Sequence, residues 1–311
     1  MRSNIKRPFF SIALLLLSFF LASSAKEKAS QISFEVHPFE GIIKTRVSVA
    51  GIDMARIIEK IDYQKGNVQE QLAAQYKLLP ASSMSKLEDM MKKNPMLGLV
   101  LAMTPPQATI YVKEKIAMVK SKGLGYELQH YHNEELDQAF LYTRSLLNTE
   151  AVTASYQPSK GYEQLFSQDK RPSLNNFTIS RSTQTAQVAG LNCDIATYTA
   201  KTGLKQPGTV SKLIVYTSKL MPKGINFSHP YYLPEANGIM RIDIYLDDSQ
   251  TPTMCYEVTS IQKTTVAADM LQPKKSTPIY QLTDREYSLK LLAVMMGGMA
   301  TLGQNDDDDD Q

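Results

Sequence analysis

The sequence predicts a mainly β fold with minor α, built on an antiparallel sheet of about ten strands. Apolar and polar residues alternate with a period of two through most of the chain from Gly41 onward. Short polar segments, rather than helices, separate most of these runs, and this favours an antiparallel meander over a parallel sheet. Helical patterns are confined to three segments.

The clearest strand covers residues 239–246, where Met240, Ile242 and Ile244 alternate with polar residues. The first strand lies around 43–49, and a longer one is expected over 107–120, with Ile110, Val112, Ile116 and Met118 on one face. Similar alternation predicts strands at 126–130, 140–142, 152–156, 177–188, 191–199, 213–217 and 254–261. Ala189-Gly190 is typical of a turn or bulge between two of them.

The three helical segments are 54–79, 84–103 and 284–303. The second is expected to begin at the capping box Ser85-x-x-Glu88 and to break at Asn94-Pro95. The third follows a capping box at Thr283 and is expected to end at Gly297-Gly298. The last two segments are too apolar to remain exposed to water, so we expect them to pack on another part of the protein. The apolar face of the sheet must also be covered, either by a second sheet, by closure of the sheet into a barrel, or by helices.

The first 25 residues have the features of a cleavable signal peptide. Basic residues at positions 2, 6 and 7 precede an apolar run over 9–21, and the small Ser23 and Ala25 occupy the cleavage positions. That run is about 13 residues long, whereas a spanning helix needs ~20, so we expect cleavage rather than a membrane anchor. We therefore expect a periplasmic or secreted protein with no membrane span after cleavage.

The expected mature chain has a β-rich domain over 26–282, with a helical insertion at 54–103. A C-terminal part, 283–311, combines the apolar helix with an acidic run at 306–310. That run fits a solvated tail, and the alternative is a contact with a divalent ion or a basic partner. Of the 34 lysines and arginines, three lie in 1–25, which leaves 31 to balance 31 acidic residues. A net charge of zero argues against a nucleic-acid partner.

Methionines form two clusters, Met84 to Met103 and Met295 to Met299. They either fill an ordinary core or form an adaptable lid over an apolar cavity, because thioether side chains fit partners of varied shape. On the second interpretation, the residues expected to line a ligand site are Met91, Met96, Leu99, Val100, Met103, Ile242 and Ile244.

Other residues are weaker candidates for a functional site. His130 and His132 share a strand face and could supply two metal ligands, but no third ligand lies nearby in sequence. Glu114 falls in phase with the apolar face, where it would be paired or would contact a ligand. The strand phases of Cys193 and Cys255 argue against a disulfide. We found no catalytic, nucleotide-binding or zinc motif, so we expect no cofactor, no metal and no catalytic residue.

The segment Ala189-Gly190-Leu191-Asn192-Cys193, followed by Ala196-Thr197-Tyr198, resembles an uncharacterised family of exported proteins common in Bacteroidota. The segments at 215–217, 238–240 and 258–261 follow in the expected order. The resemblance covers about residues 40–280 and implies a lipoprotein-carrier (LolA/LolB-like) half-barrel, whose concave apolar face is covered by helices. The methionine-rich segment at 84–103 and the part after 283 depart from the family pattern.

These observations lead to three hypotheses about function. The first is an exported, non-enzymatic envelope protein that holds an apolar ligand, such as a lipid, an acyl chain or a lipoprotein anchor, in a curved sheet. The second is an envelope interaction or structural module with a solid core and no ligand. The third is a hydrolase with dispersed catalytic residues, using His130 or His132.

Overall fold

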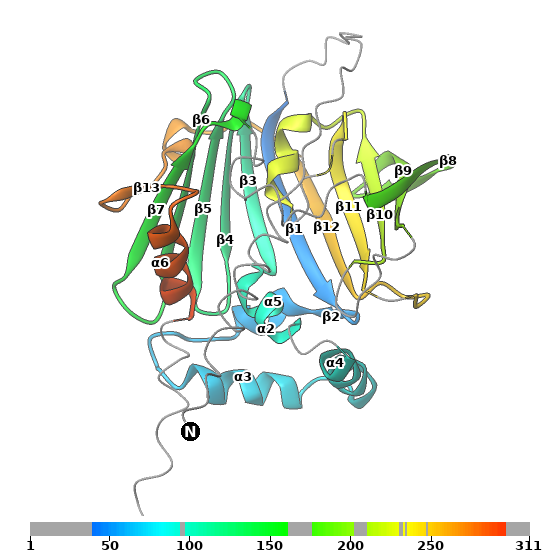
Figure 1. Cartoon of the computed structure of the whole chain (residues 1–311), viewed down its shortest axis with the longest axis horizontal. Coiled ribbons are helices and arrows are strands. Elements are labelled where there is room, and N and C mark those ends of the chain that lie inside the picture. Colours follow the sequence, from blue (N-terminus) through cyan, green and yellow to red (C-terminus); the bar gives the residue numbers. More distant parts are fainter. Residues whose placement is uncertain are drawn as a thin grey trace, which may run out of the picture.

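The computed structural model describes residues 39–93, 97–160, 176–201, 210–229, 233, 235–246 and 248–296. Strands dominate this part of the chain and helices are few, so the prediction of a mainly β fold is confirmed. Thirteen strands, rather than about ten, form one curved and mostly antiparallel sheet that does not close (Figure 1).

The sheet combines two meanders that meet at a central strand. β1 pairs with β12 on one side and with β3 on the other, and the strand order is β13-β7-β6-β5-β4-β3-β1-β12-β11-β10-β9-β8, with the short β2 paired to β1. Only β13 runs parallel to its neighbour, β7. The strands are β1 (Glu40–Val49), β2 (Ile52–Asp53), β3 (Gln107–Lys113), β4 (Ile116–Lys122), β5 (Tyr126–Asn133), β6 (Gln138–Ser145), β7 (Ala151–Tyr156), β8 (Phe177–Val188), β9 (Leu191–Ala200), β10 (Lys212–Ser218), β11 (Gly238–Tyr245), β12 (Met254–Lys263) and β13 (Ile279–Gln281).

The helices cluster at one end and along one side of the concave face (Figure 1). α2 (Met54–Glu59), α3 (Val68–Lys77), α4 (Ala81–Lys93) and α5 (Leu97–Met103) lie at the lower end, and α6 (Arg285–Met296) packs on β6 and β7. Three 3-10 helices, η1 (Pro158–Lys160), η5 (Lys223–Ser228) and η6 (Ala268–Leu271), complete the described elements. No helix in this part of the chain has the length and apolarity that a membrane crossing requires.

The concave face carries three apolar clusters. The first core joins β1 and β9–β12 to the lower helices, and here Ile242 and Ile244 are 0% and 1% exposed. A second cluster joins β5–β7 to α6, and a third joins β3, β4, β11 and β12 to Ile225 and Phe227 of η5. The hollow side of the sheet is therefore filled with side chains over much of its area.

The convex face is also covered in part. Met118 of β4 is fully buried on this side against Val266 and Leu271, which belong to the segment that runs from β12 towards β13. Both faces of β4 are consequently apolar. This arrangement explains one wrong prediction: residues 107–120 are not one strand but a hairpin, β3–β4, with a tight turn at Glu114-Lys115.

Other predicted boundaries also change. Glu114 lies in that turn, exposed and with a φ of 53°, so it does not face the apolar side of the sheet. The segment 54–79 forms two helices, because Gly66 and Asn67 both adopt left-handed backbone conformations between them. Ser85 does not begin a helix, since α4 starts at Ala81. The expected signal peptide, the expected helix break at Asn94-Pro95, Gly297-Gly298 and the acidic run lie outside the described residues.

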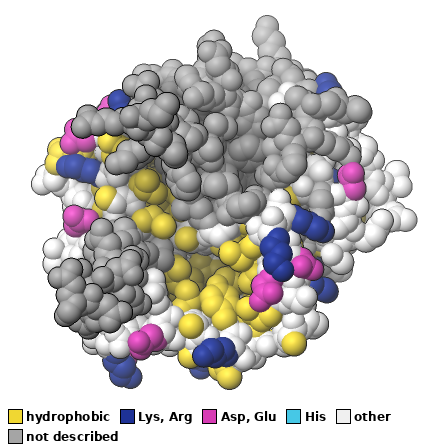
Figure 2. Space-filling view, turned by 60° about the horizontal axis from the view of Figure 1, so that its bottom comes forward, with side chains coloured by type: hydrophobic (Ala, Val, Ile, Leu, Met, Phe, Trp, Pro, Cys, Tyr) yellow, Lys and Arg dark blue, Asp and Glu magenta, His cyan; other side chains and the backbone are white. Residues whose placement is uncertain are grey.

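The lower end presents apolar surface. Half-buried side chains of α3 and α4 pack against the first core, while Leu78 beyond α3 and Met91 of α4 are exposed. Figure 2 shows this end as a hollow with an apolar floor and charged side chains on its rim.

Candidate functional site

The central feature of the concave face is a cavity of about 180 Å³. It lies where four parts of the fold meet: the sheet, η5, the end of α5 and α6. Among the residues that the structure describes, its lining is predominantly apolar and includes no lysine, arginine, aspartate or glutamate. These lining residues are Thr45, Val47, Met103, Thr104, Pro105, Ala108, Val119, Ser121, Leu128, His130, Leu141, Tyr156, Phe227, Ser228, His229, Tyr256, Leu282, Leu291 and Met295.

The floor of the cavity is a row of directly paired residues across four strands. Thr45 of β1 pairs with Ala108, Ala108 with Ser121, and Ser121 with Leu128. Paired residues in neighbouring strands point to the same face, so these four side chains lie side by side. Three of them are small, and the covering helices do not fill the space that they leave. The cavity therefore results from the strand register and from side-chain size together.

Two contacts attach the segments that line the cavity to the sheet. Tyr126 donates a hydrogen bond from its hydroxyl to the carbonyl oxygen of Met103, which fixes the end of α5 to β5. Ser228 of η5 lies with its hydroxyl 3.3 Å from the hydroxyl of Tyr256 on β12. Leu291 and Met295 of α6 complete the wall.

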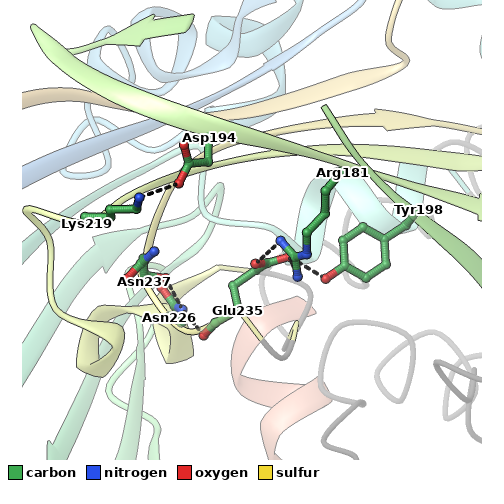
Figure 3. A network of polar contacts seen from close by, with 7 residues as sticks. All are labelled: Arg181, Asp194, Tyr198, Lys219, Asn226, Glu235 and Asn237. Carbon is green, nitrogen blue, oxygen red and sulfur yellow. Dashed lines mark hydrogen bonds and ion pairs between the residues drawn. The ribbon is translucent and has the colours of Figure 1, made fainter. Parts of the chain in front are cut away.

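The buried Asn226 fixes η5 relative to β11. Its side-chain nitrogen donates to the carbonyl oxygen of Asn237 at 2.9 Å, and its side-chain oxygen accepts from the backbone of Ile239 at 2.7 Å. Figure 3 shows Asn226 beside Glu235, whose carboxylate is held by Arg181 at 3.0 Å and by the hydroxyl of Tyr198 at 2.6 Å. The segment that follows η5 is thus tied to both β8 and β9.

Histidines gather around Phe227, the apolar side chain that η5 inserts above the sheet. The rings of His130 and His132 each lie 4.7 Å from the Phe227 ring, one edge-on and the other stacked. The prediction that these two histidines share a strand face is confirmed, although both are buried. His229 follows η5 and packs near Tyr256 on the cavity wall.

Burial keeps these imidazoles neutral. It lowers the pKa of His130 to about 3 and that of His132 to about 4, with the neighbouring His132 adding to the effect on His130. Burial lowers the pKa of His229 to about 3 and raises the pKa of Tyr256 to about 12. At neutral pH the described part of the cavity wall therefore carries no charge.

The seven residues predicted to line a ligand site do not all lie together. Of these, Met103 lines the cavity. Ile242 and Ile244 are packed in the first core, and Met91 is 41% exposed on α4. Met96 lies outside the described residues, and Leu99 and Val100 are placed by backbone alone in α5. Met295, from the second methionine cluster, joins Met103 in the wall.

Sequence reasoning missed most of the cavity lining. Ala108, Ser121 and Thr45 give no local signal, because their proximity depends on pairing between strands that are distant in sequence. Phe227 and His229 also come from a segment for which no element was predicted.

A larger groove of about 580 Å³ lies on the opposite face of β1, β3, β4 and β5. It is polar, and its charged groups are largely engaged with one another or with rings: Asp53 bridges Arg46 at 2.7 Å and Arg56 at 3.2 Å, and Lys122 lies over the ring of Tyr63. We therefore regard it as solvated surface.

The described residues contain no group of three or more His, Cys, Asp or Glu side chains that could hold a metal ion. Cys193 and Cys255 are unbridged, as their strand phases predict, but both are buried, whereas those phases place only Cys193 in a core.

No protein-family model and no curated protein matches the chain. Among solved structures, two crystal structures of PNGF-II, in space groups P21 and C2, are similar at TM-scores of 0.37 and 0.36, each with 10% sequence identity. The alignments cover 76% and 81% of this chain but 31% and 32% of those chains, so this chain spans about a third of their length. Similarity at this level carries no argument about fold or function.

Proposed function

We propose that this protein is a non-enzymatic envelope protein that binds an apolar ligand, or the apolar part of a ligand, in the cavity on the concave face of its sheet. The observation that carries the proposal is an uncharged cavity whose wall includes one methionine from each of the two methionine-rich segments, Met103 and Met295. Thioether side chains suit a wall that must fit ligands of varied shape.

The volume limits what the cavity holds as it stands. An apolar protein cavity of ~150 Å³ stays dry and takes up benzene. A cavity of about 180 Å³ thus accepts a ring or a short stretch of acyl chain. Each methylene group moved from water into it contributes about 0.8 kcal/mol to binding.

A longer acyl chain fits only if one wall of the cavity moves, and α6 is the wall best suited to move. Its residues Leu291 and Met295 contact the cavity through apolar surface. Glu286, in the first turn of the helix, accepts a hydrogen bond from Tyr280 and forms an ion pair with Lys290. Moving α6 uncovers its apolar side chains, and an acyl chain that enters beneath the helix covers that surface again.

The uncharged wall determines where the polar head group of a ligand can lie. A buried carboxylate or phosphate without a counter-charge would cost several kcal/mol. The ligand's head group therefore remains outside, and only its apolar part enters. An acyl chain or a lipoprotein anchor has this form.

The resemblance to exported carrier proteins supports the same proposal. That family's half-barrel presents a concave apolar face beneath helices, and this chain has a curved sheet with helices on its concave side. Export through the segment 1–25 would place the protein in the envelope, where acyl chains are abundant.

One alternative retains support from a specific observation. The first core, with Ile242 and Ile244, is packed solid, as an interaction module without a ligand would require. Ligand binding distinguishes the two proposals. The hydrolase hypothesis gains no comparable support, because a general base works best with a pKa near the working pH, and burial lowers the pKa of His130 to about 3 and that of His132 to about 4.

Filling the cavity tests the proposal. Ala108→Leu places a larger side chain on the floor, and Ala74→Leu adds the same atoms on the exposed surface of α3. With 1-octanol as the probe, we expect the melting temperature of the wild type and of Ala74→Leu to rise with concentration, because a ligand that binds only the folded state stabilises it. Ala108→Leu, if circular dichroism shows it folded, should lose that rise. An absent rise in the wild type, or an equal rise in Ala108→Leu, would contradict the proposal.

A further inference from the structure

Three buried hydroxyl groups have no hydrogen-bond partner within the part of the chain that the structure describes. They belong to Ser121 of β4, Thr143 of β6 and Tyr287 of α6. Thr143 and Tyr287 are 0% and 1% exposed, and Ser121 is half-buried as a residue but has a fully buried hydroxyl oxygen. Folded proteins pair nearly all of their buried polar groups, so each unpaired group calls for an explanation.

Ser121 and Thr143 belong to the row of paired residues that forms the cavity floor. Ser121 pairs with Leu128, and Leu128 pairs in turn with Thr143. Because paired residues point to the same face, the floor continues beyond Leu128 to Thr143 on the concave side. Neighbouring strands lie ~4.8 Å apart, which places these two residues, two strands apart, roughly 10 Å from each other.

α6 covers the far part of this row. The next paired residue after Thr143 is Val152 of β7, which belongs with Tyr287 and Leu291 of α6 to the second cluster. Leu291 also lines the cavity, and the helix packs on β6 and β7. A ligand that extends from the cavity beneath a displaced α6 therefore meets unpaired hydroxyls on the strands and on the helix.

An uncharged oxygen acceptor is the ligand group that fits these hydroxyls. Each of them donates one hydrogen bond. A hydrocarbon leaves all three unpaired, and a carboxylate brings a buried charge to a wall whose described residues offer no counter-charge. The oxygen atoms of an ester accept hydrogen bonds and carry no net charge. An acyl ester thus combines an apolar chain for the cavity with acceptors for the hydroxyls.

We propose that the ligand is an acyl ester, whose chain occupies the cavity and whose ester oxygen atoms accept hydrogen bonds from Ser121, Thr143 or Tyr287. This inference rests on the proposed function and specifies the class of its ligand. On this account the three hydroxyls select among apolar ligands and do not support the fold. Removing them leaves the ligand-free protein as stable as before and weakens the binding of esters alone.

Thr143→Val and Thr153→Val form a matched pair that tests the first part of this statement. Both threonines are 0% exposed, but the hydroxyl oxygen of Thr153 accepts from the backbone N–H of Ser276 at 2.7 Å and lies 2.9 Å from its hydroxyl. A paired buried hydroxyl contributes to stability and an unpaired one does not. We expect Thr153→Val to lower the melting temperature and Thr143→Val to leave it equal or higher. A similar fall in both variants would contradict the proposal.

The binding test uses methyl hexanoate and n-octane, which have main chains of equal length, and of which only the ester carries oxygen. Headspace gas chromatography measures the free concentration of each volatile probe over solutions of the purified protein. We expect Ser121→Ala with Thr143→Val to bind methyl hexanoate at least ~threefold more weakly than the wild type, because ligand hydrogen bonds are lost. Its binding of n-octane should be unchanged, and Thr153→Val should bind both probes as the wild type does.

The outcomes separate this inference from the proposed function. If the wild type binds neither probe, the proposed function fails. If the wild type binds both and the double variant weakens neither, or weakens both equally, the cavity binds apolar ligands but these hydroxyls do not select an ester, and the inference is overturned. Circular dichroism checks that each variant is folded, and the two single variants are measured in the same way in case the double variant is not.

Discussion

The Nε2 atom of His130 lies 2.6 Å from the hydroxyl of Tyr156, within the wall of the cavity. His130 is on β5 and Tyr156 is on β7, so this hydrogen bond spans the intervening β6. Both groups are buried, and a buried hydrogen bond of this kind is costly to leave unmade. The contact therefore fixes the shape of the cavity as well as the spacing of its strands.

Tyr156→Phe should destabilise the protein while preserving its fold. The variant removes one hydroxyl and leaves the buried imidazole of His130 without that partner, so we expect the free energy of unfolding to fall by about 1–3 kcal/mol. Urea denaturation followed by circular dichroism measures this change. Tyr142→Phe on β6, a residue that does not line the cavity, serves as the control and should change stability by less than about 0.5 kcal/mol. Equal effects of the two variants would contradict the assigned contact.

The buried histidines predict a loss of stability in mild acid. In the folded protein the pKa values of His130, His132 and His229 are lowered to about 3, about 4 and about 3 by burial. An unfolded imidazole titrates near ~6.5, so below that pH the unfolded chain takes up protons that the folded chain does not. Their contribution is present above pH ~6.5 and is lost as the pH falls towards the folded values.

The expected loss between pH 7 and pH 5 is roughly 2 kcal/mol for each imidazole. Urea denaturation at the two pH values measures it. His132→Phe keeps a ring against Phe227 and should show a smaller loss than the wild type. Equal stability of the wild type at both pH values would show that these imidazoles are not buried as described.

Asn226→Ala should loosen the attachment of η5 to β11. It removes the acceptor for the backbone N–H of Ile239 and the donor to Asn237. Because the unpaired groups stay buried, we expect a loss of about 2–3 kcal/mol. Asn148→Ala removes one comparable hydrogen bond in an exposed turn and should cost less than about 1 kcal/mol. Chemical denaturation of both variants provides the comparison, and a larger cost for the exposed site would refute this role of Asn226.

Ile242→Ala should reduce stability without affecting ligand binding. Ile242 is fully buried in the first core and does not line the cavity, so its truncation creates a void and costs about 2–5 kcal/mol. The melting-temperature rise with 1-octanol should remain. Met91→Ala, at an exposed position of α4, should leave both quantities nearly unchanged. Loss of the octanol response in Ile242→Ala would place the ligand in the first core instead.

The two thiols should be unreactive until the protein unfolds. Cys193 and Cys255 are buried, and burial raises the pKa of both, that of Cys255 to about 12. The thiolate is the reactive form, so a disulfide reagent such as DTNB should release no colour from the native protein. In concentrated urea two thiols per chain should react. If no thiol reacts with DTNB in urea without reductant, the two cysteines form a disulfide, which would contradict the prediction.

The mainly β fold could be predicted because alternation is a local property of the sequence. The prediction from alternation fails at Glu114-Lys115, and the reason is physical. The turn there has two residues, so Val112 pairs with Ala117, and Ile116 and Met118 point to the convex face. Since both faces of β4 are covered and apolar, the apolar run continues through the turn and hides it.

The site was harder to predict than the fold. The two methionine clusters indicated that their segments cover a sheet, and Met103 and Met295 do line the cavity. Ile242 and Ile244 share the apolar face but lie where the lower helices fill the hollow. Which part of that face stays unfilled depends on the long-range register that aligns Ala108 with Ser121. Alternation does not encode that register.

Mass spectrometry of organic extracts from the protein purified without detergent tests ligand binding most directly. We predict that the wild type releases an acyl-chain compound in near-stoichiometric amount and that Ala108→Leu, with its cavity filled, releases far less. A wild-type extract free of such compounds, from protein that is folded and does not respond to 1-octanol, would contradict the proposal that this cavity binds an apolar ligand.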